Sequence, residues 1–288
     1  MPRAEQVTEV CTHHGEGPVW DTGAGLLRFV DLLRGDVLAH RPGGPVSRRA
    51  VSTVAAALRP RRGGGLVVAV ERGFALVEPD TGAVTILPAV WDDPGVRMND
   101  GGCDPQGRFY CGSMAYDAAP GRGALYRLDA DGTVHPVLTG VTISNGIGWS
   151  ADGATVYYVD SPTQRVAAYD FDGDSGRFSR PRTVVEIPPE RGMPDGMTLD
   201  AEGGLWVALW GGGAVHRYTP DGRLDEVVEV AATRVSACAF GGDDLTDLYV
   251  TTSRQGLSGT AATEEPAAGA LFRCRPGVSG LPTTPFAG

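Results

Sequence analysis

The sequence predicts an all-β protein, a six-bladed β-propeller with a metal site in its central channel. Three observations predict this fold. One unit, made of short apolar runs and turns rich in Gly and Asp, recurs roughly every 40 to 50 residues, the period typical of propeller blades. Each unit has the pattern of an antiparallel meander, in which short strands alternate with tight turns. No stretch shows a convincing 3.6-residue apolar period of an amphipathic helix.

Six copies of the unit account for the chain. The clearest is DGMTLDAEGGLWVALWGGGAVHRYTPDG at residues 195–222, where a carboxylate beside a glycine precedes two strand-like runs and their turns. One equivalent position precedes the apolar strand of each copy, and in chain order it carries Glu16, Ala56, Asn99, Asn145, Asp195 and Ser236. Ala56 lacks an oxygen ligand and Ser236 only approximates the position. Four blades therefore offer a strong oxygen donor at one register.

Composition and charge narrow the classes of function. Of the 288 residues, 42% are hydrophobic, which is ample for a core, and the 42 glycines and 21 prolines are spread over repeated turns. No linker or change in composition divides the chain, so residues 1–288 are expected to form a single domain. A net charge of −10 disfavours nucleic acids and anionic membranes as partners. The short arginine-rich stretches at 48–49 and 59–62 are expected to be solvated loops.

The cysteines and the chain start indicate a compartment. The five cysteines are an odd number, widely spaced and without a CxxC motif. The first residues lack the apolar segment of a signal peptide, and no apolar run approaches the roughly 18 residues of a membrane-spanning helix. These features predict a reduced, cytoplasmic protein with buried structural thiols.

Three further segments complete the expected architecture. Residues 6–11 alternate like a strand and are expected to pair with residues 270–276, so that the two ends of the chain close the ring. Residues 50–58 contain several β-branched residues and are expected to enter the second blade as a strand. The Asp-rich segment 170–176 resembles a calcium-binding loop, but Pro181 stands where a bidentate glutamate is needed, so a hairpin turn is expected.

The innermost strand of every blade faces the channel of a propeller, so equivalent residues of different blades converge on its axis. Glu16, Asn99, Asn145 and Asp195 would then supply two carboxylates and two amide oxygens. Such an all-oxygen set suits Ca²⁺, Mg²⁺ or Mn²⁺, and Zn²⁺ accepts it too. Taken singly, Asp or Asn before Gly is more often a turn residue. The recurrence at one register, and the poor turn-forming character of Glu16, favour a metal site.

The motifs GEGPVWD, RMNDGGCDPQGRFYCGSM, ISNGIGWS, YYVDS and PDGMTLDAEGGLWVA, taken as a set, resemble those of the SMP-30/gluconolactonase/regucalcin family, and the resemblance runs from Glu16 to the terminal PFAG. It implies a six-bladed propeller with one catalytic divalent metal ion and lactone hydrolysis as the common activity. It also implies metal ligation by Glu16, Asn145 and Asp195.

The same resemblance implies substrate contacts. Arg97 matches a substrate-contacting arginine, and Asn99 matches a position that contacts substrate or completes the metal shell. Asp117 falls where sugar-lactone members tend to have Glu. Its side chain is one methylene shorter, a departure that argues against recognition of sugar hydroxyls and favours a different or bulkier substrate.

The function predicted on these grounds is metal-dependent hydrolysis of a sugar lactone or similar cyclic ester by activated water. Asp195 is expected to be the general base. His13 and His14 precede the register that faces the channel and are expected to lie in a loop or on an outer strand. A phosphotriesterase on the same site, a calcium-binding propeller without turnover and a lyase of the strictosidine-synthase type are the alternatives. The lactone, the metal (Ca, Zn, Mn or Mg) and the oligomeric state stay open.

Overall fold

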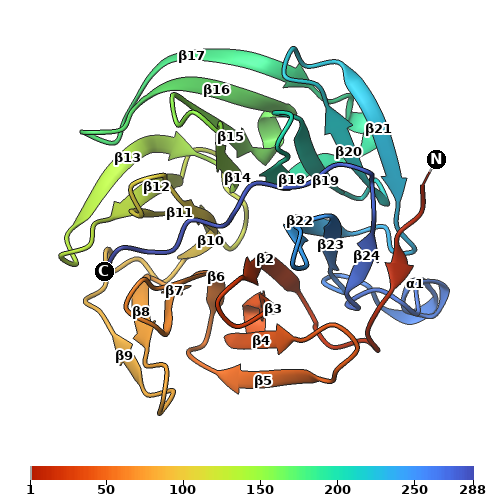
Figure 1. Ribbon diagram of the computed structural model, residues 1–288, viewed down its shortest axis with the longest axis horizontal. Coiled ribbons are helices and arrows are strands. Elements are labelled where there is room, and N and C mark those ends of the chain that lie inside the picture. Colours follow the sequence, from red (N-terminus) through yellow and green to blue (C-terminus); the bar gives the residue numbers. More distant parts are fainter. Residues whose placement is uncertain (1) are drawn as a thin grey trace.

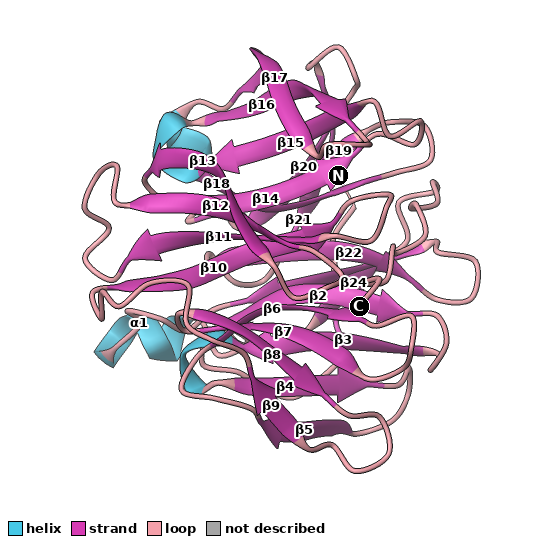
Figure 2. Ribbon diagram, turned by 90° about the vertical axis from the view of Figure 1, so that its left-hand side faces the viewer, coloured by secondary structure: helices cyan, strands magenta, loops and turns pink. Residues whose placement is uncertain are grey.

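The computed structural model describes residues 2–288, which form six four-stranded antiparallel sheets around a central channel (Figure 1). Within a blade the strands mostly follow one another outward from the channel, so each turn joins neighbours in sequence. Figure 2 shows the sheets from the side, with the short helix α1 (Gly259–Glu264) at the edge of the molecule. The predicted six-bladed β-propeller is confirmed.

Blades 1 to 3 are continuous in sequence. Blade 1 contains β2 (Gly15–Asp21), β3 (Leu26–Asp31), β4 (Asp36–His40) and β5 (Val46–Ala50). Blade 2 contains β6 (Ala55–Pro60), β7 (Leu66–Val70), β8 (Gly73–Val77) and β9 (Val84–Ile86). Blade 3 contains β10 (Val96–Cys103), β11 (Phe109–Ala115), β12 (Gly123–Leu128) and β13 (Val134–Val141).

Blades 4 and 5 repeat this order, and blade 6 combines both chain ends. Blade 4 contains β14 (Ser144–Trp149), β15 (Thr155–Asp160), β16 (Arg165–Asp172) and β17 (Arg177–Glu186). Blade 5 contains β18 (Met193–Leu199), β19 (Leu205–Trp210), β20 (Ala214–Tyr218) and β21 (Leu224–Glu229). Blade 6 contains β22 (Val235–Gly241), β23 (Asp247–Thr252), β24 (Phe272–Cys274) and β1 (Glu5–Gln6). Single 3₁₀ turns, η1 (Leu32–Arg34), η2 (Ser161–Thr163) and η3 (Pro189–Arg191), occupy connections.

The ring closes where the N-terminal strand joins the last blade. Strand β1 pairs antiparallel with β24 through Glu5 opposite Arg273 and Gln6 opposite Phe272. The strand is shorter than the predicted 6–11, but backbone bonds from Val7 to Leu271 and from Cys11 to Gly269 keep the following residues along the same edge. The predicted pairing of the two chain ends is therefore confirmed.

Two other local predictions have mixed outcomes. Strand β6 begins at Ala55, so the strand expected over 50–58 is correct for 55–58 and wrong for 51–54, where the chain crosses between blades. The turn expected at 170–176 joins β16 to β17, and the Asp172 carboxylate accepts bonds from the amides of Asp174 and Ser175 at 3.0 and 3.2 Å. The hairpin is confirmed.

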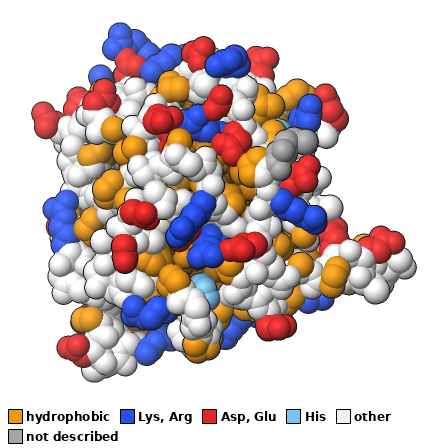
Figure 3. All heavy atoms as spheres, turned by 45° about the vertical axis from the view of Figure 1, so that its right-hand side comes forward, with side chains coloured by type: hydrophobic (Ala, Val, Ile, Leu, Met, Phe, Trp, Pro, Cys, Tyr) orange, Lys and Arg blue, Asp and Glu red, His pale blue; other side chains and the backbone are white. Residues whose placement is uncertain are grey.

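The cysteines and helices of the described residues agree with the expectations from composition. All five cysteines are free; Cys103, Cys111 and Cys238 are buried, whereas Cys11 and Cys274 are partly exposed. No helix within residues 2–288 is long and apolar enough to cross a membrane. On the face shown in Figure 3, acidic and basic side chains are interspersed.

Every innermost strand carries a β-bulge at the same step. Its pairing with the next strand shifts register between Glu16 and Val19, Ala55 and Ala57, Met98 and Gly101, Ser144 and Ile147, Pro194 and Met197, and Val235 and Ala237. Five of the six positions identified from sequence lie inside these bulges, and Glu16 lies directly before the bulge of blade 1. A bulge disrupts the pairing locally and re-aims a side chain, and bulges are frequent beside active sites. The recurrent residue pattern therefore reflects one repeated backbone feature.

Glycines beside these positions let neighbouring innermost strands approach. A Cβ on Gly146 would lie 2.8 Å from the carbonyl oxygen of Asp195, and one on Gly196 would lie 2.4 Å from the Cβ of Ala237. The Asn-Gly and Asp-Gly pairs therefore do not form turns here. They lie inside strands β14 and β18, where the glycine provides space for the next blade.

Replacing one such glycine should strain the ring. Gly196→Ala is expected to destabilise the protein by about 1–3 kcal/mol, as overpacking of a close contact does, and so to lower the midpoint of thermal unfolding by several degrees. Gly63→Ala is the matched control, because nothing lies within 4 Å of its added Cβ and its φ is not positive. Equal midpoints for the two variants would contradict this account of the close approach.

Candidate active site

Four polar side chains converge near the start of the innermost strands. Glu16, Asn99, Asn145 and Asp195 come from blades 1, 3, 4 and 5, and each residue is only 4–6% exposed. All lie at or beside the β-bulges. One hydrogen bond and one electrostatic effect link them: Asn99 Nδ2 donates to Asn145 Oδ1 at 2.8 Å, and the charge of Glu16 raises the pKa of Asp195.

A chain of hydrogen bonds orients the amide groups. Arg97 Nη1 donates to Asn99 Oδ1 at 2.7 Å, and Asn99 Nδ2 donates onward to Asn145 Oδ1. Asn145 Nδ2 donates to Ser161 Oγ at 2.7 Å, and that hydroxyl donates to the carbonyl oxygen of Pro194 at 2.6 Å. The chain links blades 3, 4 and 5, so Asn145 presents its carbonyl oxygen in a defined direction.

Ionisation of the buried carboxyl groups of the site is unfavourable. Burial, followed by repulsion from Asp100, raises the pKa of Glu16 to about 8. Burial, followed by repulsion from Glu16 and Asp100, raises the pKa of Asp195 well above its usual range. Arg97 offsets part of this negative charge. Such a concentration of buried carboxylates favours either protonation or a bound cation.

Asp100 is a member of the cluster that the sequence analysis missed. It lies within the bulge of β10 and is 9% exposed, and its Oδ1 accepts a bond from the amide of Gly101 at 2.7 Å. Burial raises its pKa. It directly follows Asn99 in the RMND motif, so its adjacency to a candidate residue was a usable signal, but a regular strand would turn it to the other face.

The donor set fits a divalent cation. Oδ1 of Asp195 is buried and has no hydrogen-bond partner in the structure, so a lone pair in the site is unsatisfied. Two carboxylates and one amide oxygen, from Glu16, Asp195 and Asn145, are ligands that hard cations accept. Within residues 2–288 no group of three or more His, Cys, Asp and Glu side chains is spaced as a metal centre; the set proposed here depends on the amide of Asn145.

His14 directly precedes strand β2, as expected, but its ring lies at the site. Its ring is 4% exposed, with Nε2 3.9 Å from Glu16 Oε1 and Nδ1 bonded to Ser253 Oγ at 2.6 Å. An edge-on contact with Trp210, at 5.6 Å between ring centroids, holds it from the other side. Burial, then the charge of Arg97, lowers the pKa of His14 to about 3, so it is a neutral wall of the site. His13 is partly exposed in the preceding loop.

Arg97 is covered by an aromatic residue at the mouth of the site. Its Cζ lies 5.8 Å from the ring centroid of Tyr116, which is 46% exposed. The Tyr116 hydroxyl donates to Glu71 Oε1 at 2.6 Å and so bridges blades 3 and 2. Only Nη1 of Arg97 donates to described residues, namely Met98 and Asn99, which leaves Nε and Nη2 for a substrate oxygen.

Asp117 and the two remaining register positions do not join the polar cluster. Asp117 is exposed in the turn after β11, where its Oδ1 accepts a bond from the amide of Ala119 at 3.0 Å. Ala56 is fully buried and offers no donor. The Ser236 hydroxyl is used in the fold, since it donates to the carbonyl oxygen of Gly15 at 2.5 Å. A substrate contact by Asp117 stays a prediction from the resemblance alone.

Fold and site together define a class of protein, a six-bladed propeller with a buried, acidic, oxygen-donating centre in its channel. Comparison with known sequences then narrows the class. The family model described as SMP-30/Gluconolactonase/LRE-like region matches residues 14–254. The protein belongs to this family.

Relatives and solved structures agree with the assignment. Regucalcin of Sus scrofa is 37% identical over 96% of this chain and 95% of its own length, and a Bacillus subtilis protein provisionally named a sugar lactone lactonase is 34% identical over 95% of each. A regucalcin from Agrobacterium tumefaciens, described as a calcium-binding protein, superposes with a TM-score of 0.93 at 30% identity, covering 99% of this chain and 97% of that one.

The buried carboxylates predict how stability depends on pH in metal-free protein. Glu16 has a pKa of about 8 in the folded state against an ordinary 4.5, so its contribution is fully present below pH 4.5 and is lost as the pH rises through about 8. Histidines depressed by burial oppose this trend only below their ordinary pKa of 6.5. Between pH 6.5 and 8 the thermal midpoint in EDTA should therefore fall.

A matched variant isolates the cause. Glu16→Gln keeps the shape of the side chain and removes its titration, so its midpoint should fall less over the same pH range. A divalent cation should raise the midpoint of the wild type at the upper end, because it favours the ionised carboxylates. A wild-type midpoint that rises with pH in EDTA would contradict the buried-anion account.

Proposed function

We propose that the protein is a divalent-metal-dependent lactonase that opens a sugar lactone or a similar cyclic ester. The family assignment supports lactone hydrolysis as the reaction class. The observation that carries the metal dependence is the unpartnered, buried Oδ1 of Asp195 beside the second buried carboxylate, Glu16. Glu16, Asn145 and Asp195 would hold the ion.

A bound divalent ion would supply Lewis acidity to the carbonyl group of the lactone and to the attacking water. The residues of the chain do the rest. Asp195 removes a proton from the water and returns it to the departing alkoxide oxygen. Ring opening breaks the acyl–oxygen bond, and the products are one carboxylate and one hydroxyl in a single hydroxy acid.

Arg97 and Asn99 position the substrate. The free Nε and Nη2 of Arg97 can donate to ring or carbonyl oxygens, while its Nη1 is fixed by Asn99 and by the backbone. Because Arg97 is only 4% exposed, hydrogen bonds to its guanidinium are made away from bulk water and discriminate strongly between substrates that can accept them and those that cannot. The neutral ring of His14 and the indole of Trp210 form an uncharged side of the same site.

Removing the proposed base should abolish turnover. Asp195→Asn keeps the size of the side chain but cannot accept the proton, so kcat should fall by about 10²–10⁴. A pH-indicator screen of aldonolactones, with Ca, Zn, Mn or Mg re-added after EDTA, measures both activity and metal dependence. Asp131→Asn, in an exposed turn, is the control and should retain activity.

Each alternative has its own outcome in that screen. Turnover of phosphotriesters but not of lactones would replace the proposed substrate class. Metal binding without hydrolysis of any ester would make the protein a binding propeller. Full activity in Asp195→Asn would remove Asp195 from the role of base.

Substitutions of Tyr116 and Asp117 test which residue at the mouth of the site contacts the substrate. The structure favours Tyr116, whereas the family resemblance implies Asp117. Tyr116→Ala removes the ring from Arg97 and should raise KM about two- to fivefold, the scale of an exposed cation–π contact. Asp117→Ala should leave KM nearly unchanged, because that carboxylate faces solvent and bonds its own turn. A larger effect on KM for Asp117→Ala than for Tyr116→Ala, measured on the best lactone, would show that Asp117 moves to the substrate.

A further inference from the structure

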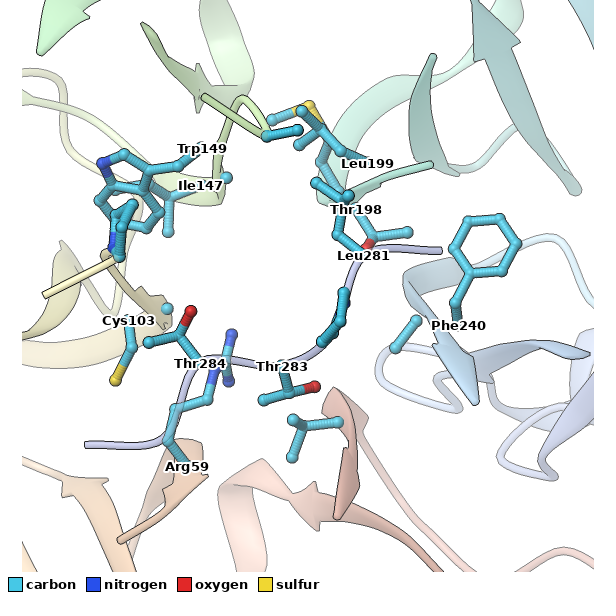
Figure 4. A pocket seen from close by; sticks show the side chains of 18 of the residues that line it. Arg59, Cys103, Ile147, Trp149, Thr198, Leu199, Phe240, Leu281, Thr283 and Thr284 are labelled. Carbon is cyan, nitrogen blue, oxygen red and sulfur yellow. The ribbon is translucent and has the colours of Figure 1, made fainter. Parts of the chain in front are cut away.

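A second cavity occupies the other end of the channel. Its volume is about 290 Å³ (Figure 4). The proposed active site uses residues near the beginning of the innermost strands, such as Asn145 and Asp195, whereas this cavity is lined by residues at their ends, such as Cys103, Trp149 and Leu199. The two sites therefore share the channel and open at opposite mouths.

The C-terminal segment forms one wall of this cavity. Figure 1 shows it crossing the face of the propeller, and residues 281–284 line the cavity. Backbone bonds fix both ends of the crossing: the amide of Gly280 donates to Leu245 and that of Phe286 donates to Pro60, each at 2.8 Å. Phe286 is 2% exposed and is part of the hydrophobic core. The C-terminal segment is therefore held firmly in place as a wall of the cavity.

A fixed cation points into the cavity. Nη1 of Arg59 donates to the carbonyl oxygen of Leu58 at 2.6 Å and Nη2 to that of Gly101 at 2.8 Å. These bonds orient the guanidinium, and Figure 4 shows it reaching into the open space. No carboxylate of residues 2–288 makes an ion pair with Arg59 within 4.0 Å, although the charge of Arg59 offsets part of the effect of burial on the pKa of Asp100.

Hydroxyl groups and apolar surfaces surround this cation. The hydroxyls of Thr198, Thr283 and Thr284 line the cavity, and none has a hydrogen bond to another described side chain or backbone group. Apolar side chains form the opposite surfaces, including Trp149, Leu199 and Phe240. A ligand would meet one positive group, a few donors and an apolar remainder.

We propose that this cavity binds a small organic monocarboxylate with a short apolar body. One preoriented guanidinium matches a single carboxylate in a two-pronged arrangement. A phosphate dianion would need more donors, and an aldonate, with a hydroxyl on most of its carbons, does not match the apolar surfaces. The cavity is therefore different in chemistry from the active site, and its occupant does not depend on which reaction that site performs.

Isothermal titration with n-hexanoate tests the proposal. Hexanoate should bind the wild type, whereas 1-hexanol should bind about tenfold or more weakly because it lacks the charge-assisted bonds, and hexylammonium should not bind. Arg59→Gln should weaken hexanoate binding by a similar factor, and Thr198→Leu, which removes one hydroxyl and narrows the cavity, should also weaken it. Circular dichroism confirms that each variant is folded.

Two controls assign the binding to this mouth of the channel. Glu16→Gln alters the active-site mouth and should leave hexanoate affinity unchanged. Bound hexanoate should alter tryptophan fluorescence in the wild type but not in Trp149→Phe. The proposal is overturned if hexanoate does not bind the wild type, if Arg59→Gln and Thr198→Leu both bind it normally, or if binding is lost only in Glu16→Gln.

Discussion

The structure depends on one constraint, the β-bulge that interrupts the innermost strand of every blade at an equivalent step. A regular strand alternates its side chains between two faces, both covered by neighbouring blades. The bulge adds a residue to that strand and re-aims the side chain. Because all blades share it, residues as far apart in the sequence as Glu16 and Asp195 meet at one point, and glycines such as Gly146 and Gly196 allow the strands to approach closely enough.

Bringing several carboxyl groups together in the channel destabilises the folded protein, and a purely structural role does not explain why they are there. Glu16, Asp100 and Asp195 are all buried, and burial raises the pKa of each carboxyl above its usual range; repulsion from neighbouring carboxylates adds to this for Glu16 and Asp195. Apolar residues at these positions would pack without this cost, as Ala56 does in blade 2. Strongly shifted carboxyl groups gathered in one place are typical of functional sites. Protonation or a bound cation would offset this cost, which would link the stability of the ring to the state of the site.

The sequence was sufficient for the parts that repeat. The fold, the blade number and the shared register of Glu16, Asn99, Asn145 and Asp195 all follow from recurrence, which averages out the ambiguity of any single motif. Features that occur once were harder to predict. Asp100 reaches the site because a bulge turns it there, and His14 reaches it from a loop whose path is set by the last blade, through Ser253. Asp117 is the opposite case: it was predicted from its place in a motif, but its side chain bonds its own turn and lies outside the polar cluster.

The two mouths of the channel differ in how they can acquire specificity. Where the innermost strands end, short turns such as 22–25 and 104–108 connect them to the next strand and leave little room for added residues. The longer connections, such as 116–122 and 253–271, lie at the active-site end, and Tyr116 enters that site from one of them.

At the other mouth of the channel, additional side chains come from a segment outside the blades. The C-terminal segment supplies them, since Thr283 and Thr284 lie beside Arg59 only because Phe286 anchors the chain beyond the crossing. A ligand at that mouth would therefore be recognised by two parts of the chain that no blade repeat brings together, one cation from blade 2 and hydroxyls from the tail.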